Sequence, residues 1–195
     1  LVPASVRTLR KEAGGLICVS LSGDVHRKIG LPLMADVLRH AGQAFPVLEA
    51  VSAENLKYDR HSTFSLTVNH KDTFTGVTDK DRALTISRLA TLAGEAVKRE
   101  NGWAADAFAE QFRSPGHVPV LNASEPLLAD RRGHTELTTA LMIMAGLTPS
   151  ATICEMMGDD DRALSREDAK AYARDHNLVF LEGKDIVRAW QKWSA

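Results

Sequence analysis

The sequence predicts one domain of the α/β or α+β class, built around a mixed β-sheet. Candidate strands and helices alternate along all 195 residues, which is the pattern of a sheet covered by helices. The composition, 44% hydrophobic and 25% charged, is that of an ordinary globular protein. We find no internal repeat, low-complexity tract or linker, so residues 1–195 are expected to form a single domain.

The N-terminal part contains short elements that glycine and proline separate. Pro3 suits the first turn of a helix, and Gly14-Gly15 ends it. The next apolar run, L-I-C-V-S-L, is bounded by glycines and predicts a buried strand. In chain order we expect a helix over 3–13, a strand over 16–21, a helix over 24–30 and an irregular stretch over 31–51.

A half-buried strand and the longest helix come next. Over residues 62–69, Phe64, Leu66 and Val68 alternate with polar residues, which is typical of a strand. Thr78 and Asp81 form a capping-box pattern at the helix start, and Asn101-Gly102 marks its end. The apolar face of this helix is expected to consist of Leu89, Leu92, Ala93, Ala96 and Val97.

The second half of the chain again alternates helices with strands. Ser165, with Asp168 three residues later, is the pattern of a helix cap and predicts a helix start. In chain order we expect a helix over 104–112, a loop over 112–117, a strand over 118–121, a helix over 134–145, a strand over 151–156, a helix over 165–174, a strand over 178–181 and a helix over 185–193.

Charge and apolar runs exclude several classes of partner. With 24 basic and 25 acidic residues the net charge is −1, so no overall field attracts nucleic acid or an anionic membrane. No apolar run approaches 18 residues, and the start of the chain does not resemble a signal peptide. Cys18 and Cys154 are too few for a disulfide framework and are expected to be small buried residues in a reducing cytosol. Any anion site must therefore be local.

Residues 131–136, R-R-G-H-T-E, place two arginines and a glycine where a helix is expected to begin. The first amide groups of a helix have no partner inside it, and the helix dipole adds positive charge there. Arg131 adds a guanidinium that binds phosphate through two hydrogen bonds, Thr135 adds a hydroxyl, and Gly133 lets an oxyanion approach the backbone. The motif predicts a site for a phosphate or a phosphosugar; the alternative is an ordinary helix start with surface arginines.

Three other positions carry groups that suit catalysis or binding. His117 lies in S-P-G-H, directly before a strand, where catalytic residues are common; the alternative is a turn histidine. Glu155 ends an apolar strand, so its carboxylate lies either at the rim of the sheet or in a costly buried place. Residues 74–82, F-T-G-V-T-D-K-D-R, have the parts for a second contact to an oxygen anion. Motifs for nucleotide binding and zinc proteolysis do not occur.

Five short motifs occur in a fixed order along the chain. They are G-L-I-C (15–18), T-G-V-T-D-K-D-R (75–82), F-R-S-P-G-H-V (112–118), R-R-G-H-T-E (131–136) and T-I-C-E-M (152–156). Each is weak alone, but their order and spacing together resemble the 3,4-dihydroxy-2-butanone 4-phosphate synthases, enzymes of riboflavin biosynthesis. The resemblance runs from residue 1 to about residue 180, and the middle, residues 40–61, is similar to the archaeal form.

The resemblance implies a three-layer fold around a mixed, twisted sheet, and a homodimer with two sites at the subunit interface. It also implies a cytoplasmic lyase that uses Mg²⁺ or Mn²⁺ to convert D-ribulose 5-phosphate to L-3,4-dihydroxy-2-butanone 4-phosphate and formate. In that chemistry a base removes the C3 proton to give an enediol, which the divalent ion stabilises. The C1 hydroxyl then leaves, and a rearrangement expels C4 as formate.

The resemblance also assigns roles to residues of this chain. His134 matches a metal ligand, and His117 with Glu155 matches the essential histidine and glutamate, to which we assign proton transfer. The residues expected to contact substrate are Cys18, Thr75, Arg131, Arg132, Gly133, His134, Thr135 and Glu155.

One part of the family pattern does not occur in this sequence. It is an acidic loop near the N-terminus, D-x-D-x-R-E-x-E-x-D, which implies a second metal ligand and an arginine for the substrate. The chain begins where the helix after that loop is expected, so we expect further residues upstream. A single imidazole is a poor site for Mg²⁺, which prefers oxygen ligands. The alternative is therefore a non-catalytic relative that binds a phosphosugar without turning it over.

Overall fold

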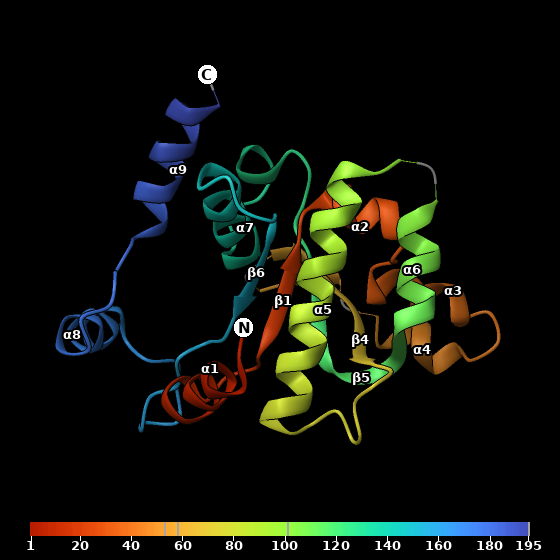
Figure 1. Cartoon of the computed structure of the whole chain (residues 1–195), viewed down its shortest axis with the longest axis horizontal. Coiled ribbons are helices and arrows are strands. Elements are labelled where there is room, and N and C mark those ends of the chain that lie inside the picture. Colours follow the sequence, from red (N-terminus) through yellow and green to blue (C-terminus); the bar gives the residue numbers. More distant parts are fainter. Residues whose placement is uncertain (53, 58, 101, 195) are drawn as a thin grey trace.

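The computed structural model describes residues 1–52, 54–57, 59–100 and 102–194, and its centre is a four-stranded mixed sheet (Figure 1). Strand β1 (Cys18–Leu21) lies parallel to β5 (Phe112–Asn122) and antiparallel to β6 (Ser150–Ile153), while β4 (Phe64–His70) lies antiparallel to β5. The predicted class and the mixed sheet are confirmed. In the order in which they lie side by side, the strands are β4, β5, β1 and β6.

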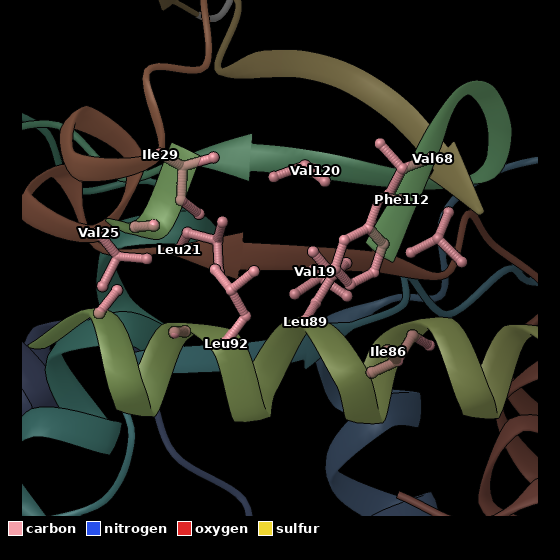
Figure 2. Close-up of a cluster of buried hydrophobic side chains, with 14 of the residues drawn as sticks. Val19, Leu21, Val25, Ile29, Val68, Ile86, Leu89, Leu92, Phe112 and Val120 are labelled. Atoms are coloured by element: carbon pink, nitrogen blue, oxygen red, sulfur yellow. The ribbon is translucent and has the colours of Figure 1, made fainter. Parts of the chain in front are cut away.

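Helices cover both faces of this sheet and make the three layers that the resemblance implies. Helix α5 (Asp79–Lys98) lies along one face, where its apolar side chains meet Val19 and Leu21 of β1 (Figure 2). Helix α7 (His134–Met144) lies on the other face, because Thr139 donates from its hydroxyl to Ser20 at 3.1 Å. Successive residues of a strand point to opposite faces, so Val19 and Leu21 face α5 while Ser20 between them faces α7.

The main core lies between the sheet and α5 (Figure 2). The hydroxyl of Thr78 accepts the backbone N–H of Asp81 at 3.1 Å, so the predicted cap at the start of α5 is confirmed. Buried residues then recur three or four positions apart, as a helix with one apolar face requires. Val97 was predicted on that face but is 46% exposed, because it lies at a surface pocket beside Pro149 and Trp190. The buried apolar residues of α5 are Ala83, Ile86, Leu89, Leu92, Ala93 and Ala96.

The other elements are short and mostly begin and end where the sequence predicts. Ser165 caps the helix that follows it, since its hydroxyl accepts the N–H of Asp168 at 3.1 Å. No helix in the described ranges is long and apolar enough to cross a membrane. These elements are α1 (Pro3–Thr8), a π-helical turn (Leu9–Ala13), α2 (Gly23–Ile29), α3 (Met34–Ala41), α4 (Pro46–Ala50), β2 (Glu54–Leu56), β3 (Asp59–His61), α6 (Trp103–Gln111), a 3₁₀ turn (Leu127–Ala129), α8 (Arg166–Asp175) and α9 (Gly183–Trp193).

Several predicted elements were wrong in type or extent. Residues 31–51, expected to be irregular, contain α3 and α4, and residues 112–117, expected to be a loop, pair with β4 as the first half of β5. Residues 178–181 form no strand; Val179 is 84% exposed, because the run finds no sheet edge to join. The alternation predicted for β4 is broken by a register shift between Phe64 and Thr67.

Candidate active site

A pocket of about 640 Å³ opens where α7 begins. Its walls come from β1, from the loop before α7, from the first turn of α7 and from the residues that follow β6. These segments are far apart in the sequence, and the sheet brings them together. Most of the predicted site residues line this pocket, namely Cys18, Arg131, Arg132, Gly133, His134, Thr135 and Glu155.

The start of α7 offers backbone amides to the pocket. Its N-cap residue is Gly133, and no side chain caps the helix. An uncapped helix start of this kind leaves amide donors and the positive end of the dipole to a ligand. The hydroxyl of Thr135 lies 3.5 Å from that of Thr63 at the pocket wall. The geometry thus has the parts of the anion site that the motif predicts.

Arg131 is held at the pocket wall by a buried carboxylate that the sequence reasoning missed. Glu136 is fully buried, and it forms an ion pair with the guanidinium of Arg131. Its other oxygen accepts the backbone N–H of Ser124 at 3.0 Å. In a capping box, a glutamate at the third helical position pairs with a serine or threonine at the cap. The cap residue here is glycine, which has no hydroxyl. This mismatch was the signal in the sequence that the glutamate binds another group.

Arg132 differs from Arg131 in its surroundings. Its side chain is exposed, and its Nε donates to the carbonyl oxygen of Leu128 at 3.4 Å. It still lines the pocket, so it adds positive charge at the rim, but its guanidinium is not held in one orientation as that of Arg131 is.

Glu155 lies at the rim of the sheet, the first of the two places expected for it. Its Oε2 accepts the N–H of Leu16 at 2.9 Å, and its backbone carbonyl accepts the N–H of Gly15 at 3.0 Å. Cys18 is buried beside it, and this burial, with the charge of Glu155 as a second cause, raises the pKa of the Cys18 thiol to about 12. Cys18 is therefore a neutral wall of the pocket at pH 7. Cys154, also expected to be buried, is only partly so.

His117 and Thr75 do not line this pocket but lie together elsewhere. Leu121 is the pocket residue of β5, and His117 comes four residues earlier, about 13 Å along an extended strand. The expected second anion contact at residues 74–82 stays a prediction, but two backbone amides of this segment already have a partner. The N–H groups of Thr75 and Gly76 already donate to Asp81, at 3.2 and 2.9 Å.

A sequence model of 3,4-dihydroxy-2-butanone 4-phosphate synthase matches residues 1–189, which is nearly the whole chain. The chain belongs to this family. The motif order that indicated the family is thus confirmed, and riboflavin biosynthesis is the pathway in which the family works.

Archaeal synthases are more similar to this chain than plant ones are. The 3,4-dihydroxy-2-butanone 4-phosphate synthase of Methanothermobacter thermautotrophicus is 45% identical over 98% of this chain and 81% of its own length. That of Methanosarcina mazei is 47% identical over 97% and 76%. A chloroplastic riboflavin biosynthesis protein of Arabidopsis thaliana is 29% identical over 97% of this chain and 34% of its own length. The predicted similarity to the archaeal form is confirmed.

Solved synthase structures share the fold. The enzyme of Candida albicans superposes with a TM-score of 0.71 at 25% identity, covering 97% of this chain and 79% of its own. A 3,4-dihydroxy-2-butanone 4-phosphate synthase in complex with two magnesium ions gives the same TM-score and identity, covering 98% and 80%. A family member thus binds a divalent cation.

The described residues of this synthase contain few candidate metal ligands in one place. Within that part of the chain, no group of three or more histidine, cysteine, aspartate and glutamate side chains is close enough to hold a metal. The pocket holds the exposed imidazole of His134 with the carboxylates of Asp130 and Glu155; Mg²⁺ commonly takes one or two carboxylates and fills its other positions with water or substrate oxygens. The assignment of His134 as a metal ligand stays a prediction.

Proposed function

We propose that this chain is a lyase that converts D-ribulose 5-phosphate to L-3,4-dihydroxy-2-butanone 4-phosphate and formate. The observation that carries the proposal is the pocket at the start of α7, where an arginine, uncapped helix amides and a carboxylate from another element converge. Membership of the synthase family supports the same reaction.

Binding is assigned to the first turn of α7 and the loop before it. Arg131, fixed by Glu136, and the amides that follow Gly133 bind the phosphate of the substrate or the oxygens of its sugar. The Thr135 hydroxyl adds a directed hydrogen bond, and Arg132 adds charge at the rim. All these groups are donors or cations, as a phosphorylated sugar requires.

Glu155 is the proton-transfer group inside the pocket. The N–H of Leu16 holds one of its oxygens, so the carboxylate has a fixed direction. Cys18 beside it stays a thiol at neutral pH and shapes the wall without adding charge. A positioned carboxylate of this kind accepts or donates a proton at a fixed carbon or oxygen of the substrate.

His117 and Thr75 are assigned to the reaction through a second copy of the chain, in a homodimer with its two sites at the subunit interface. Neither residue lines the pocket of its own chain, and His117 lies about 13 Å along β5 from the pocket residue Leu121. Phe74 and Val77, on either side of the Thr75 turn, are 94% and 52% exposed. Exposed apolar residues next to a functional cluster support a contact surface there.

Mixing two inactive variants tests this assignment. His117→Ala and Arg131→Ala are purified separately, unfolded, mixed in equal amounts and refolded. If the two side chains serve one site from different subunits, half of the dimers carry one intact site, and about a quarter of the wild-type activity returns. If both act within one chain, mixing restores nothing, and the interface assignment is wrong.

The proposal includes Mg²⁺ or Mn²⁺ as the cofactor and the cytoplasm as the location. The synthase solved with two magnesium ions supports a divalent ion. A sugar phosphate is charged and is costly to move across a lipid bilayer, so its enzyme works in the compartment that makes it.

Formate release is the direct test of the reaction. The purified chain is incubated with D-ribulose 5-phosphate with and without Mg²⁺, and formate is measured with a coupled formate dehydrogenase. We expect formate with Mg²⁺, and a loss of at least about 100-fold in Glu155→Gln, because a proton-transfer group contributes that much. Binding of the sugar phosphate without formate would instead support the non-catalytic relative, and formation of ribose phosphate alone would indicate an isomerase.

A further inference from the structure

Asn69 contacts the backbone N–H and the ring Nδ1 of His117 and joins this residue to the Thr75 turn. Its Oδ1 accepts the backbone N–H of His117 at 2.8 Å. Its Nδ2 donates to the carbonyl oxygen of Thr75 at 3.4 Å and lies 3.2 Å from Nδ1 of the His117 ring. Asn69 is only 3% exposed, so these contacts use most of its hydrogen-bonding capacity.

These contacts determine which way the Asn69 amide points. With its oxygen and nitrogen exchanged, the NH₂ group would face the N–H of His117, and the oxygen would face the Thr75 carbonyl. Both encounters are repulsive, so the oxygen must lie on the His117 backbone. Oδ1 is also 3.3 Å from the ring Nδ1, but it is farther than Nδ2 and already accepts the stronger bond.

The turn at Gly76 is shaped to admit this amide. A Cβ on Gly76 would lie 2.1 Å from Nδ2 of Asn69, and the residue has a φ of +96°. Glycine is therefore required there for two reasons, close approach and backbone conformation. The amide is held between Gly76 and His117, so it cannot turn without moving the strand or the turn.

We propose that Asn69 is a positioning residue that donates to Nδ1 of His117 and so fixes the neutral ring as the Nε2–H tautomer. The hydrogen bond at one ring nitrogen decides which nitrogen carries the proton. His117 then presents an N–H to the reacting molecule and acts as a hydrogen-bond or proton donor to an oxygen, not as the base that takes the C3 proton. The catalytic part of this inference rests on the proposed function; the tautomer does not.

The charged groups near this cluster are bound to the turn and not to the ring. Asp81 accepts the amides of Thr75 and Gly76, and Arg113 donates to the carbonyl oxygens of Thr73 and Phe74 at 3.2 and 3.4 Å. The pKa of the adjacent His70 is lowered by burial, which favours the neutral form of that ring. In the described part of the chain, the ring contact at Nδ1 therefore comes from an uncharged amide.

Nitrogen-15 NMR of the histidine rings tests the tautomer without any assay of activity. Protein labelled in its histidines is recorded at pH 8, and the His117 signals are identified by their loss in His117→Gln. We expect the shift pattern of a neutral ring with its proton on Nε2. A proton on Nδ1, or the averaged pattern of two tautomers, overturns the proposal even if Asn69→Asp does not fold.

Asn69→Asp tests the consequence for activity. A carboxylate at this position accepts from Nδ1–H, so the neutral ring of the variant carries no proton on Nε2. We expect kcat to fall about tenfold or more between pH 7 and pH 9, as the imidazolium loses its proton, with KM little changed. Wild type has no such loss. Asn177→Asp, the same change at an exposed site, is the matched control and keeps the wild-type profile.

The two possible failures are distinguishable. If wild type releases no formate, the proposed function fails while the NMR result still stands or falls alone. If wild type is active and Asn69→Asp keeps the wild-type pH profile, the donor role of His117 is wrong. If Asn69→Asp becomes more active at high pH, His117 is the base and the inference is reversed.

Discussion

The starts of α5 and α7 use similar residues, yet their backbone amides have different partners. Each start has a nearby glycine, threonines and an acidic residue in the first turn. At α5, Asp81 accepts the amides of Thr75 and Gly76, and its own amide is capped by Thr78. At α7, the cap position is Gly133, which has no side chain, and the acidic residue, Glu136, turns away to Arg131.

The comparison teaches that the acidic side chain decides what a helix start can bind. The short side chain of Asp81 accepts the amides of the turn just before α5, where an external anion would otherwise bind. The start of α5 therefore has a structural role. The longer Glu136, itself buried, reaches the partly buried Arg131 and leaves the α7 amides to the pocket. Where side chains of the protein accept the first backbone N–H groups, the helix start has a structural role. Where these N–H groups stay open to a pocket, the helix start can bind an anionic ligand.

The largest effect is expected from Glu136→Gln, which breaks the pair that shapes the α7 start. Arg131 would lose its buried charge partner, and removing one member of a buried pair costs about 3 kcal/mol or more. Urea denaturation measures this loss in the free energy of unfolding. The matched control is Glu167→Gln, whose pair with Arg166 is exposed and is worth about 0–1 kcal/mol. Equal effects of the two variants would show that the buried pair does not organise α7.

Asp81→Asn is expected to cost about 2 kcal/mol at pH 7, because a charged acceptor of backbone amides is replaced by a neutral one. The amide of Gly76 is the main cause that lowers the pKa of Asp81 in the folded chain. The stabilisation is therefore complete above the unfolded pKa near 4 and is lost as pH falls through the lower folded value.

Denaturation of wild type and Asp81→Asn at pH 7, 5 and 3 measures this dependence. The difference between them should be the same at pH 7 and 5 and smaller at pH 3. A difference that stays constant to pH 3 would mean that the carboxylate charge does not matter at the α5 start.

Gly133→Ser should convert the α7 start into one like that of α5. A serine hydroxyl at the cap position accepts the amide of Thr135 or Glu136 and fills the anion site. We expect KM for D-ribulose 5-phosphate to rise about tenfold while stability does not fall, since serine and glycine caps differ by only a few tenths of a kcal/mol. Steady-state kinetics and thermal unfolding measure the two quantities.

Gly133→Ala separates capping from crowding. A Cβ at this position would lie 2.3 Å from Nη1 of Arg131, the far end of a flexible side chain, so the guanidinium must shift by a similar small amount in both variants. Only serine can accept the helix amides. If alanine raises KM as much as serine does, the position of Arg131 and not the open amides accounts for binding at α7.

Local patterns in the sequence predicted the capped helices well. Thr78 with Asp81 and Ser165 with Asp168 are contacts within one turn, so the sequence alone contains both partners. The apolar run 178–181 failed, because strand pairing needs a free sheet edge that no local pattern reveals.

The site was predictable in its residues but not in its geometry. The motif 131–136 indicated an anion site, and most of its residues line the pocket. Glu136 was missed, because its partner Ser124 comes from a loop whose path depends on the whole fold. The separation of His117 from the pocket depends on β5 extending back through residues 112–117, which the sequence predicted to be a loop.

The smallest effect is expected from Thr78→Ala, which removes the cap of α5 and nothing else. Loss of a threonine cap costs about 1 kcal/mol, and urea denaturation should show it. Formate release should stay at the wild-type rate, because this hydroxyl contacts its own helix. The change is thus the converse of Gly133→Ser, which should weaken binding without lowering stability. If Thr78→Ala instead raised KM with no loss of stability, the α5 start would also hold substrate, and the contrast between the two helix starts would be wrong.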